Sequence, residues 1–152
     1  MELLWTRLEG QTGHEAAYQL LAQAVSPLPE IQKTAQGKPC FTHGGLHFSI
    51  SHTDRHSFCC VHDHNVGIDG EEIGRAIDLK LARKMLSPGE KRRFDAAPDK
   101  ADALLRLWVL KEAFAKLTGR GWGNYLKETD FDPFDPRIQI IDGCYVAILE
   151  DK

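Results

Sequence analysis

The chain has 152 residues, of which 42% are hydrophobic and 27% charged, a balance typical of one soluble globular domain. Lysine and arginine number 19 against 22 aspartates and glutamates, so the formal net charge is -3. That charge removes the bulk electrostatic argument for a nucleic-acid-binding protein. A chain of this length buries about 70% of the surface that it exposes when unfolded, so no disulfide or structural metal is required for folding.

The apolar stretches of the sequence are a handful of residues long, well short of the ~18 that a membrane-spanning helix needs. The N-terminus also lacks the pattern of a secretory signal. We therefore expect no membrane association and a cytoplasmic location. We expect the 4 cysteines to be buried free thiols, because the adjacent Cys59 and Cys60 lie in an apolar run typical of a strand.

The first part of the chain predicts one helix followed by strands. Thr12 and Glu15 have the spacing of a capping box, and apolar residues recur at helical spacing from there to Ser26-Pro27. A turn is expected at residues 36–39, and residues 46–51 alternate as in a half-buried strand. Two more short strands are expected at 57–61 and 65–69. Their close spacing predicts an antiparallel meander.

The second part predicts helices and a final hairpin. Helical spacing runs from Ile77 to Phe94, with a break where Ser87 and Glu90 form a second capping box. Residues 99–118 are the longest predicted helix, and we expect it to be largely buried because apolar residues occur all round it. The dipeptide Asp142-Gly143 between runs 137–141 and 144–149 predicts a hairpin with a type I′ turn.

Two groups of charged residues stand in otherwise apolar surroundings. Asp69 and Glu71 lie at the end of a predicted strand, and side chains two residues apart point to the same side. Paired carboxylates repel unless a cation lies between them, and Mg²⁺ is held by one or two carboxylates together with substrate phosphates. The alternative is a solvated strand end rich in acids.

The second group lies in the middle of the predicted buried helix. Trp108, Lys111, Glu112 and Lys116 fall within an arc of roughly 140°. Burying charges is costly unless they have partners, which indicates a site. The alternative is an ordinary exposed pair between Glu112 and Lys116, which are one helical turn apart.

Taken together, the two groups resemble the signature of the 4′-phosphopantetheinyl transferase superfamily. That signature is V/I-G-V/I-D followed by W-x-x-K-E-x-x-x-K, which here reads Val66 to Asp69 and Trp108 to Lys116. Residues 37–39, 48–53 and 86–90 are similar, in the same order, to further motifs of the surfactin-synthetase-activating branch. The resemblance covers about residues 36 to 123.

The resemblance implies transfer of the 4′-phosphopantetheine arm of coenzyme A, with Mg²⁺, to a serine of an acyl or peptidyl carrier protein. It also implies an α+β fold with two halves, about 1–64 and 65–152, related by a pseudo-twofold axis within one domain of residues 1–152. Each half would be a small antiparallel sheet packed on helices. The predicted order of elements is compatible with this fold.

The resemblance further implies roles for individual residues. The magnesium carboxylates would be Asp69, Glu71 and Glu112. The contacts to coenzyme A would be Lys38, Pro39, Ser51, His52, Lys111 and Lys116. The catalytic residues would be Glu90, Glu112 and Lys116, with Glu90 acting as a base toward the carrier serine.

Several of these roles have a structural alternative. Glu90 is explained almost as well as the partner of Ser87 in a capping box. Lys111 either contacts coenzyme A or pairs with an acid that keeps the site aligned. Trp108 is expected to pack beneath the site rather than to bind a ligand. Gly70 stands where the family more often has an apolar residue, which leaves open whether Glu71 or Glu72 faces the metal.

Partner surfaces are suggested by charge and by the N-terminal part. A local positive cluster forms the predicted docking surface for acidic carrier proteins, with a solvated helix face as the alternative. Its members are Lys80, Arg83, Lys84, Lys91, Arg92 and Arg93. Only Arg7 and Lys33 are basic before Lys38, fewer than the branch usually supplies for coenzyme A. A shortened first half would expose apolar edges, which leaves open whether the chain forms a homodimer.

Two other functions remain as alternatives. A non-catalytic module that binds coenzyme A or a carrier protein would fit the short N-terminal part. A zinc-binding protein would use the histidines, because all but one of the 7 lie between His43 and His64. Their spacing, however, fits no standard set of zinc ligands.

Overall fold

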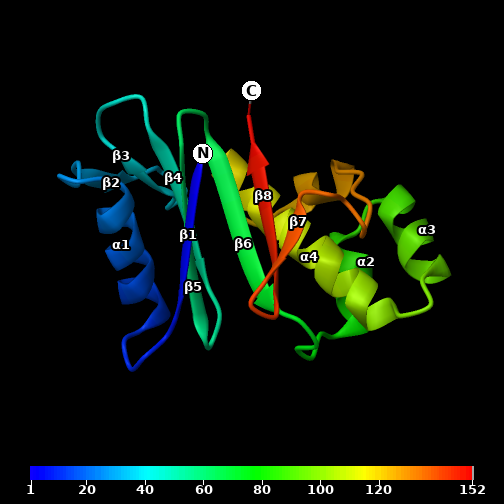
Figure 1. Cartoon of the computed structure of the whole chain (residues 1–152). Helices are drawn as coiled ribbons and strands as arrows, with labels where there is room; N and C mark the ends of the chain where they lie inside the picture. The colour runs from blue at the N-terminus through cyan, green and yellow to red at the C-terminus, as the bar shows by residue number, and fades with distance from the viewer. Residues whose placement is uncertain (152) are drawn as a thin grey trace.

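Two three-stranded antiparallel sheets form the centre of the fold (Figure 1). In this computed structural model, which describes residues 1–151, the first sheet has the order β1-β5-β4 and the second β6-β8-β7. The strands of the first sheet are β1 (Glu2–Arg7), β4 (His47–His52) and β5 (His56–His62). Those of the second are β6 (Val66–Glu72), β7 (Ile138–Ile141) and β8 (Cys144–Glu150). The predicted α+β class with small antiparallel sheets is therefore confirmed.

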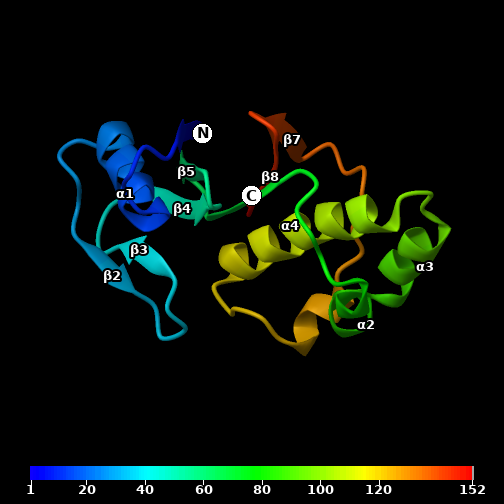
Figure 2. The ribbon, with the colours of Figure 1, turned by 90° about the horizontal axis from the view of Figure 1, so that it is seen from below.

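One long helix covers each sheet (Figure 2). Helix α1 (Gly13–Ala24) packs on the first sheet, beside a small hairpin of β2 (Ile31–Lys33) and β3 (Pro39–Phe41). Helix α4 (Lys100–Thr118) packs on β6 and β8 of the second. The remaining helices lie beside α4, away from the second sheet: η1 (Leu79–Leu81), α2 (Ala82–Met85), α3 (Pro88–Ala96) and η2 (Asn124–Glu128).

Most of the predicted local elements are present with the expected ends. Both capping boxes form, at Thr12 with Glu15 and at Ser87 with Glu90. Asp99 caps α4, and the helix ends at Gly119, whose φ of 69° is left-handed. The turn between β7 and β8 has positive φ at Asp142 (47°) and Gly143 (78°), as a type I′ turn requires.

The predicted meander of three strands is wrong. Strands β4 and β5 do form an antiparallel hairpin, but β6 pairs with β8 rather than with β5. The partner of β6 comes from the far end of the chain, and local strand patterns carry no information about such long-range pairing. The pattern also missed β1, which pairs with β5 at the edge of the first sheet.

The two sheets meet along β4 and β6 through serine side chains. The hydroxyl of Ser49 accepts a hydrogen bond from the N–H of Ile68, and the hydroxyl of Ser51 accepts one from the N–H of Gly70, each at 3.1 Å. These bonds satisfy buried donors of β6 where no backbone partner is paired. Apolar residues of both sheets then pack in one layer, including Phe58, Cys60, Val66, Ile68, Cys144, Val146 and Ile148.

The cysteines carry no disulfide. Cys59, Cys60 and Cys144 are buried and Cys40 is half-buried, so the prediction of free thiols is confirmed and that of burial holds for three of them. Within the described residues, no helix combines the length and apolar character needed to cross a bilayer.

Candidate active site

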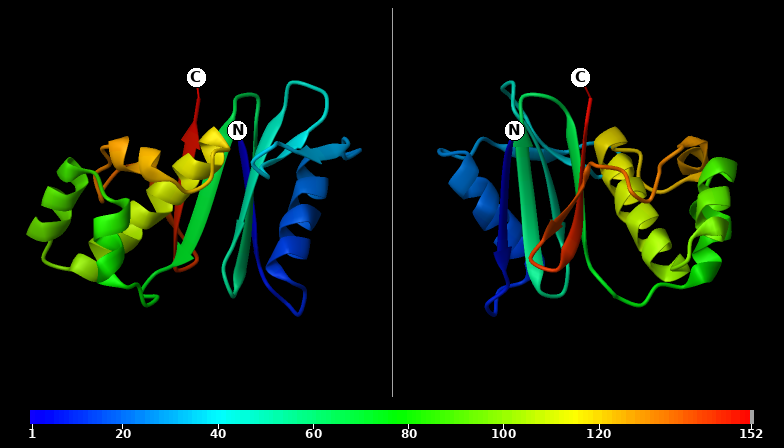
Figure 3. Two further views of the ribbon diagram at one scale, coloured as in Figure 1. Left: turned by 180° about the vertical axis from the view of Figure 1, so that it is seen from behind. Right: turned by 45° about the vertical axis from the view of Figure 1, so that its right-hand side comes forward.

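Strands β4 and β6 run beside each other between α1 and α4 (Figure 3). A cleft of about 400 Å³ lies between these elements and the β2–β3 hairpin. Residues from all of these elements line it: His14, Tyr18, Lys33, Gly37, Pro39, Ile50, Ser51, His52, Asp69, Glu71, Glu112 and Lys116. The structure thus brings together most of the residues to which the sequence assigned a role.

Gly67 of β6 makes this convergence sterically feasible. A β-carbon at this position would lie 2.1 Å from the carbonyl oxygen of Ala113 and 2.5 Å from the amide nitrogen of Leu117. Only glycine therefore lets the backbone of α4 come this close to β6. The glycine of the V-G-I-D motif is thus the reason that Glu112 and Lys116 can face Asp69.

Asp69 is the most buried acid of the cleft. Its Oδ1 accepts hydrogen bonds from Ser51 Oγ at 3.1 Å and from Lys116 Nζ at 3.0 Å. Its Oδ2 is buried and has no partner among the described residues. Burial is the largest influence on the pKa of Asp69 and raises it, the charge of Lys116 lowers it and that of Glu112 raises it, which leaves the pKa at about 6.

Glu71 and Glu112 are each held by an indole N–H. Trp108 Nε1 donates to Glu71 Oε1 at 3.2 Å, and Arg75 binds both oxygens of Glu71 at 2.7 and 3.3 Å. Trp122 Nε1 donates to Glu112 Oε1 at 2.6 Å. The contact of Trp108 with Glu71 is more direct than the packing role expected from the sequence.

The three carboxylates repel one another. Burial is the largest cause of a raised pKa at each, but Glu112 also raises the pKa of Asp69, Asp69 that of Glu71, and Glu71 that of Glu112. Such a set of acids is stabilised by a cation among them, and oxygen donors are what Mg²⁺ prefers.

The donor set therefore fits a hard divalent cation, and the partnerless Oδ2 of Asp69 is the observation that supports it. Each acid is also bound to another group of the chain: Asp69 to Lys116, Glu71 to Arg75, and Glu112 to Trp122. Within residues 1–151, no three His, Cys, Asp or Glu side chains form a ready-made cluster that could hold an ion.

A second, more apolar hollow of about 230 Å³ continues the cleft along α4. The two share Gly37, Pro39, Ile50, Glu112 and Lys116, and the second adds Phe48, Ala115, Gly121 and Trp122 among its walls. Charged groups at one end and apolar walls at the other suit an elongated ligand with a phosphate end and an uncharged arm.

Lys38 lines this second hollow rather than the carboxylate cleft. Its ammonium donates to Asn65 Oδ1 at 2.7 Å and to the carbonyl oxygens of Leu117 and Val66 at 3.2 and 3.4 Å. Burial lowers the pKa of Lys38. The ammonium therefore ties the β2–β3 hairpin to the end of α4, whereas Pro39 lies at the boundary of both hollows.

Glu90 and Lys111 line neither the carboxylate cleft nor the apolar hollow, so their placement does not support the predicted roles of base and coenzyme A contact. Both side chains are fully buried, and Lys111 Nζ pairs with Glu90 Oε1 at 2.5 Å. The oxygens of Glu90 also accept from the backbone nitrogens of Ser87 and Phe131, each at 2.9 Å. Of the alternatives left open by the sequence, the structure thus shows the cap role for Glu90 and the acid pair for Lys111.

Four residues of the site were not singled out as ligand-facing by the sequence. His14 and Tyr18, whose rings lie 4.8 Å apart, reach the cleft from α1, and Lys33 reaches it from β2. Helix periodicity identifies the polar face of α1 but not what that face meets. Trp122 had one usable signal, the glycines at 121 and 123 on either side of a large aromatic residue.

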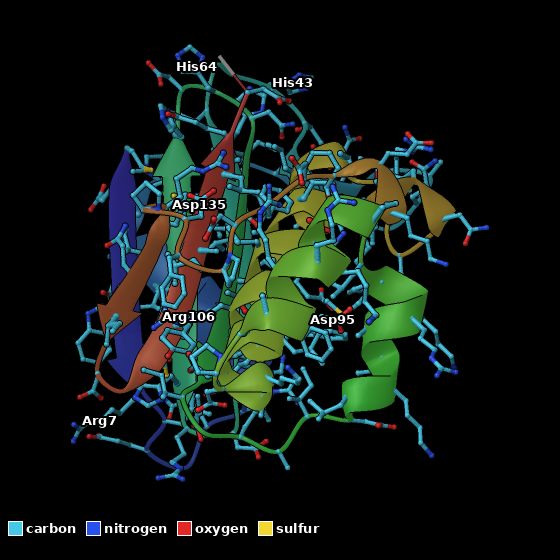
Figure 4. All side chains as sticks on the ribbon, turned by 90° about the vertical axis from the view of Figure 1, so that its right-hand side faces the viewer. Arg7, His43, His64, Asp95, Arg106 and Asp135 are labelled. Atoms are coloured by element: carbon cyan, nitrogen blue, oxygen red, sulfur yellow. The ribbon has the colours of Figure 1, made fainter. Side chains whose placement is uncertain are left out.

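The histidines between positions 43 and 64 disperse over the molecule. His52 lines the cleft, whereas His56 faces Asp142 and Glu72, and His62 faces Asp63 and Glu150. His43 and His64 lie at one end of the sheets, and Arg7, which binds Asp142, lies at the opposite end (Figure 4).

Comparison with known proteins identifies the family to which this chain belongs. A model of the 4′-phosphopantetheinyl transferase superfamily matches residues 65–146, which include Asp69, Glu71, Glu112 and Lys116. The chain belongs to this superfamily.

Its curated relatives include three proteins named 4′-phosphopantetheinyl transferase. They are gsp of Aneurinibacillus migulanus, 35% identical over 93 residues (60% of this chain, 38% of the relative), and psf-1 of Bacillus pumilus, 37% identical over 100 residues (62% and 42%). The third is AcpT of Salmonella typhimurium, 36% identical over 105 residues (66% and 55%). The matched region thus spans about half or less of each relative.

Proposed function

We propose that this chain transfers the 4′-phosphopantetheine arm of coenzyme A to a serine of an acyl or peptidyl carrier protein, with Mg²⁺. The convergence of Asp69, Glu71, Glu112 and Lys116 in a cleft that continues into an apolar hollow is the observation that carries the proposal. The relatives named 4′-phosphopantetheinyl transferase support the same reaction.

Asp69, Glu71 and Glu112 are the residues that would hold the ion. Bound there, Mg²⁺ would neutralise charge on the diphosphate of coenzyme A as its phosphoanhydride bond breaks. The serine oxygen would form a new bond to the phosphorus that carries the pantetheine arm, and adenosine 3′,5′-bisphosphate would leave with the electron pair of the broken P–O bond.

The chain's own side chains would bind and orient the substrate. The ammonium of Lys116 donates to Asp69 Oδ1 and to the carbonyl of Ile50, which holds it at the cleft, where it would meet a phosphate. His52 is exposed at the end of β4 and reaches the same space. The apolar walls around Ile50 and Ala115 would take the uncharged pantetheine arm.

The proton of the carrier serine needs an acceptor at the cleft. Glu90 is enclosed beside Lys111 and is unsuited to this role. Glu112 borders both the carboxylate cleft and the apolar hollow, and burial raises its pKa. We therefore assign the proton acceptor to Glu112.

The positive cluster is the surface that we propose for the carrier protein. Lys91 pairs with Asp95 and Arg93 with Asp130, each at 2.6 Å, which neutralises part of the cluster. Lys80, Arg83, Lys84 and Arg92 are exposed, and no ion pair is found for them among the described residues. These four would attract an acidic partner.

Because coenzyme A is a cytosolic metabolite, we place the activity in the cytoplasm.

The alternative function is a module that binds coenzyme A or a carrier protein without transfer. Intact-mass spectrometry separates the two functions. Several apo carrier proteins are incubated with the chain, coenzyme A and Mg²⁺, and with EDTA in a parallel sample. We expect a gain of one phosphopantetheine only with Mg²⁺. No gain on any carrier, together with calorimetric binding of coenzyme A, would establish the binding module instead.

A further inference from the structure

The segment that follows α4 returns a tryptophan onto the candidate metal site. Gly119 and Gly121 both have φ of 69°, a conformation that favours glycine, and they turn the chain back along the end of the helix. Tyr125 fixes this turn, because its hydroxyl donates to the carbonyl of Gly121 at 2.5 Å. Trp122, between Gly121 and Gly123, thereby reaches the apolar hollow beside Glu112 while 44% of its surface stays exposed.

The indole of Trp122 supplies the one hydrogen bond found to Glu112 among the described residues, from Nε1 to Oε1 at 2.6 Å. Its ring also stacks on that of Trp108, with centroids 4.9 Å apart and planes 27° apart. Trp108 in turn donates from Nε1 to Glu71 Oε1 at 3.2 Å. Two stacked indoles thus each hold one of two acids that belong to different elements, β6 and α4.

We propose that the stacked pair of Trp108 and Trp122 positions Glu71 and Glu112 for a divalent cation, with Trp122 as the positioning residue of Glu112. The inference rests on the proposed function, because it assumes that these acids bind the ion. It adds a role for Trp122, which lies outside the W-x-x-K-E-x-x-x-K motif.

The physical argument is one of preorganisation. Two carboxylates that face each other rotate apart unless other groups hold them, and that rotation must be reversed before an ion binds. A rigid stack has little freedom, so the two N–H groups keep their acids at a fixed separation. Groups that hydrogen-bond to metal ligands in this way change metal affinity by about 10–100-fold when they are removed.

The two tryptophans differ in what remains after substitution. Without the N–H of Trp122, Glu112 keeps no hydrogen-bond donor among the described residues. Without that of Trp108, Glu71 is still held by Arg75 through both oxygens. The proposal therefore predicts a larger effect for Trp122→Phe than for Trp108→Phe, and phenylalanine retains a ring for the stack.

The experiment measures Mn²⁺ binding directly, by the electron paramagnetic resonance signal of free Mn²⁺ in the presence of coenzyme A. We expect Trp122→Phe to raise the dissociation constant about 10–100-fold, and Trp108→Phe to raise it less. Trp5→Phe is the matched control: Trp5 is 42% exposed and lies on β1, outside the cleft, so its substitution should leave the dissociation constant unchanged. Thermal unfolding confirms that each variant is folded.

The outcomes separate this inference from the proposed function. If wild-type protein binds Mn²⁺ and Trp122→Phe binds it equally well or more tightly, the positioning role is overturned and the metal site stands. If wild-type protein binds no Mn²⁺, the metal-dependent function and the positioning role both fail. An effect of the same size in Trp5→Phe would also overturn the proposal, because the loss would then not come from the cleft.

Discussion

Lys116 donates to only one oxygen of Asp69, Oδ1 at 3.0 Å, and the other oxygen is buried without a partner among the described residues. A buried carboxylate with one unsatisfied oxygen is costly, and the pKa of Asp69, raised to about 6, reflects that cost. A ligand that contacts Oδ2 would therefore remove this cost and bind favourably.

Removing Asp69 should separate catalysis from folding. We expect Asp69→Ala and Glu112→Ala to abolish phosphopantetheine transfer, because each removes an acid assigned to the ion, while far-UV circular dichroism stays unchanged.

The raised pKa of Asp69 should also make the stability of the protein depend on pH. The protonated Asp69 side chain stabilises the folded state below about pH 4, and this stabilisation is lost as pH rises through about 6, because the folded state holds the proton more tightly. Urea unfolding should show this decline in wild-type protein without metal, and Asp69→Asn should lack it.

Gly67 should tolerate no side chain. In Gly67→Ala the new β-carbon would overlap the backbone of α4 at Ala113 and Leu117, so the helix must move away from β6. We expect a loss of about 1–3 kcal/mol in the free energy of unfolding and a larger fractional loss of transfer activity, because Lys116 moves with the helix. Gly45→Ala is the matched control, since its β-carbon meets nothing within 4 Å. Equal stability of the two variants would contradict the steric argument.

The pair of Lys111 and Glu90 should stabilise the fold rather than bind coenzyme A. Lys111→Met leaves Glu90 as a buried acid without its cation, and we expect a loss of about 3–5 kcal/mol in urea unfolding. The double variant Lys111→Met with Glu90→Gln should recover part of that loss. A folded Lys111→Met protein with normal stability and weakened coenzyme A binding would instead restore the ligand role predicted from the sequence.

Asp142 links the β7–β8 turn to the first sheet and should make that link sensitive to acid. Its carboxylate accepts from Arg7 at 2.6 and 2.7 Å and lies 2.8 Å from His56 Nε2. Arg7 and His56 hold the pKa of Asp142 well below its usual range. The stabilisation is therefore present above the unfolded pKa near 4 and is lost as pH falls. Asp142→Asn should lower stability at pH 7 but show a smaller further loss between pH 5 and 3.

Charge reversal should test the carrier surface. The double variant Arg83→Glu with Arg92→Glu adds negative charge to an exposed cluster, so we expect a raised KM for an acidic carrier protein and a weaker dependence on salt. The kcat and the affinity for coenzyme A should not change. Lys127→Glu, another exposed site, is the control. Unchanged KM and salt dependence in the double variant would reject this docking surface.

Local chemistry made much of this protein predictable. The capping boxes at Thr12 and Ser87, the left-handed stop at Gly119 and the turn at Asp142-Gly143 depend on residues close in the chain, and all are present. The V-G-I-D and W-x-x-K-E-x-x-x-K motifs also identified the family. Their residue types, order and spacing can be recognised in the sequence before any contact between them is known.

Tertiary structure decided what local patterns do not contain. Strand β6 pairs with β8 across most of the second half of the chain, so the predicted meander failed. Lys111 and Glu112 are adjacent in the sequence, yet they point to different sides of α4. Lys111 forms a buried pair with Glu90, whereas Glu112 lines the cleft. Trp122 acquires its partner only because two glycines fold the chain back onto α4. The residue types fix which chemistry is available, whereas long-range packing fixes which of those groups meet.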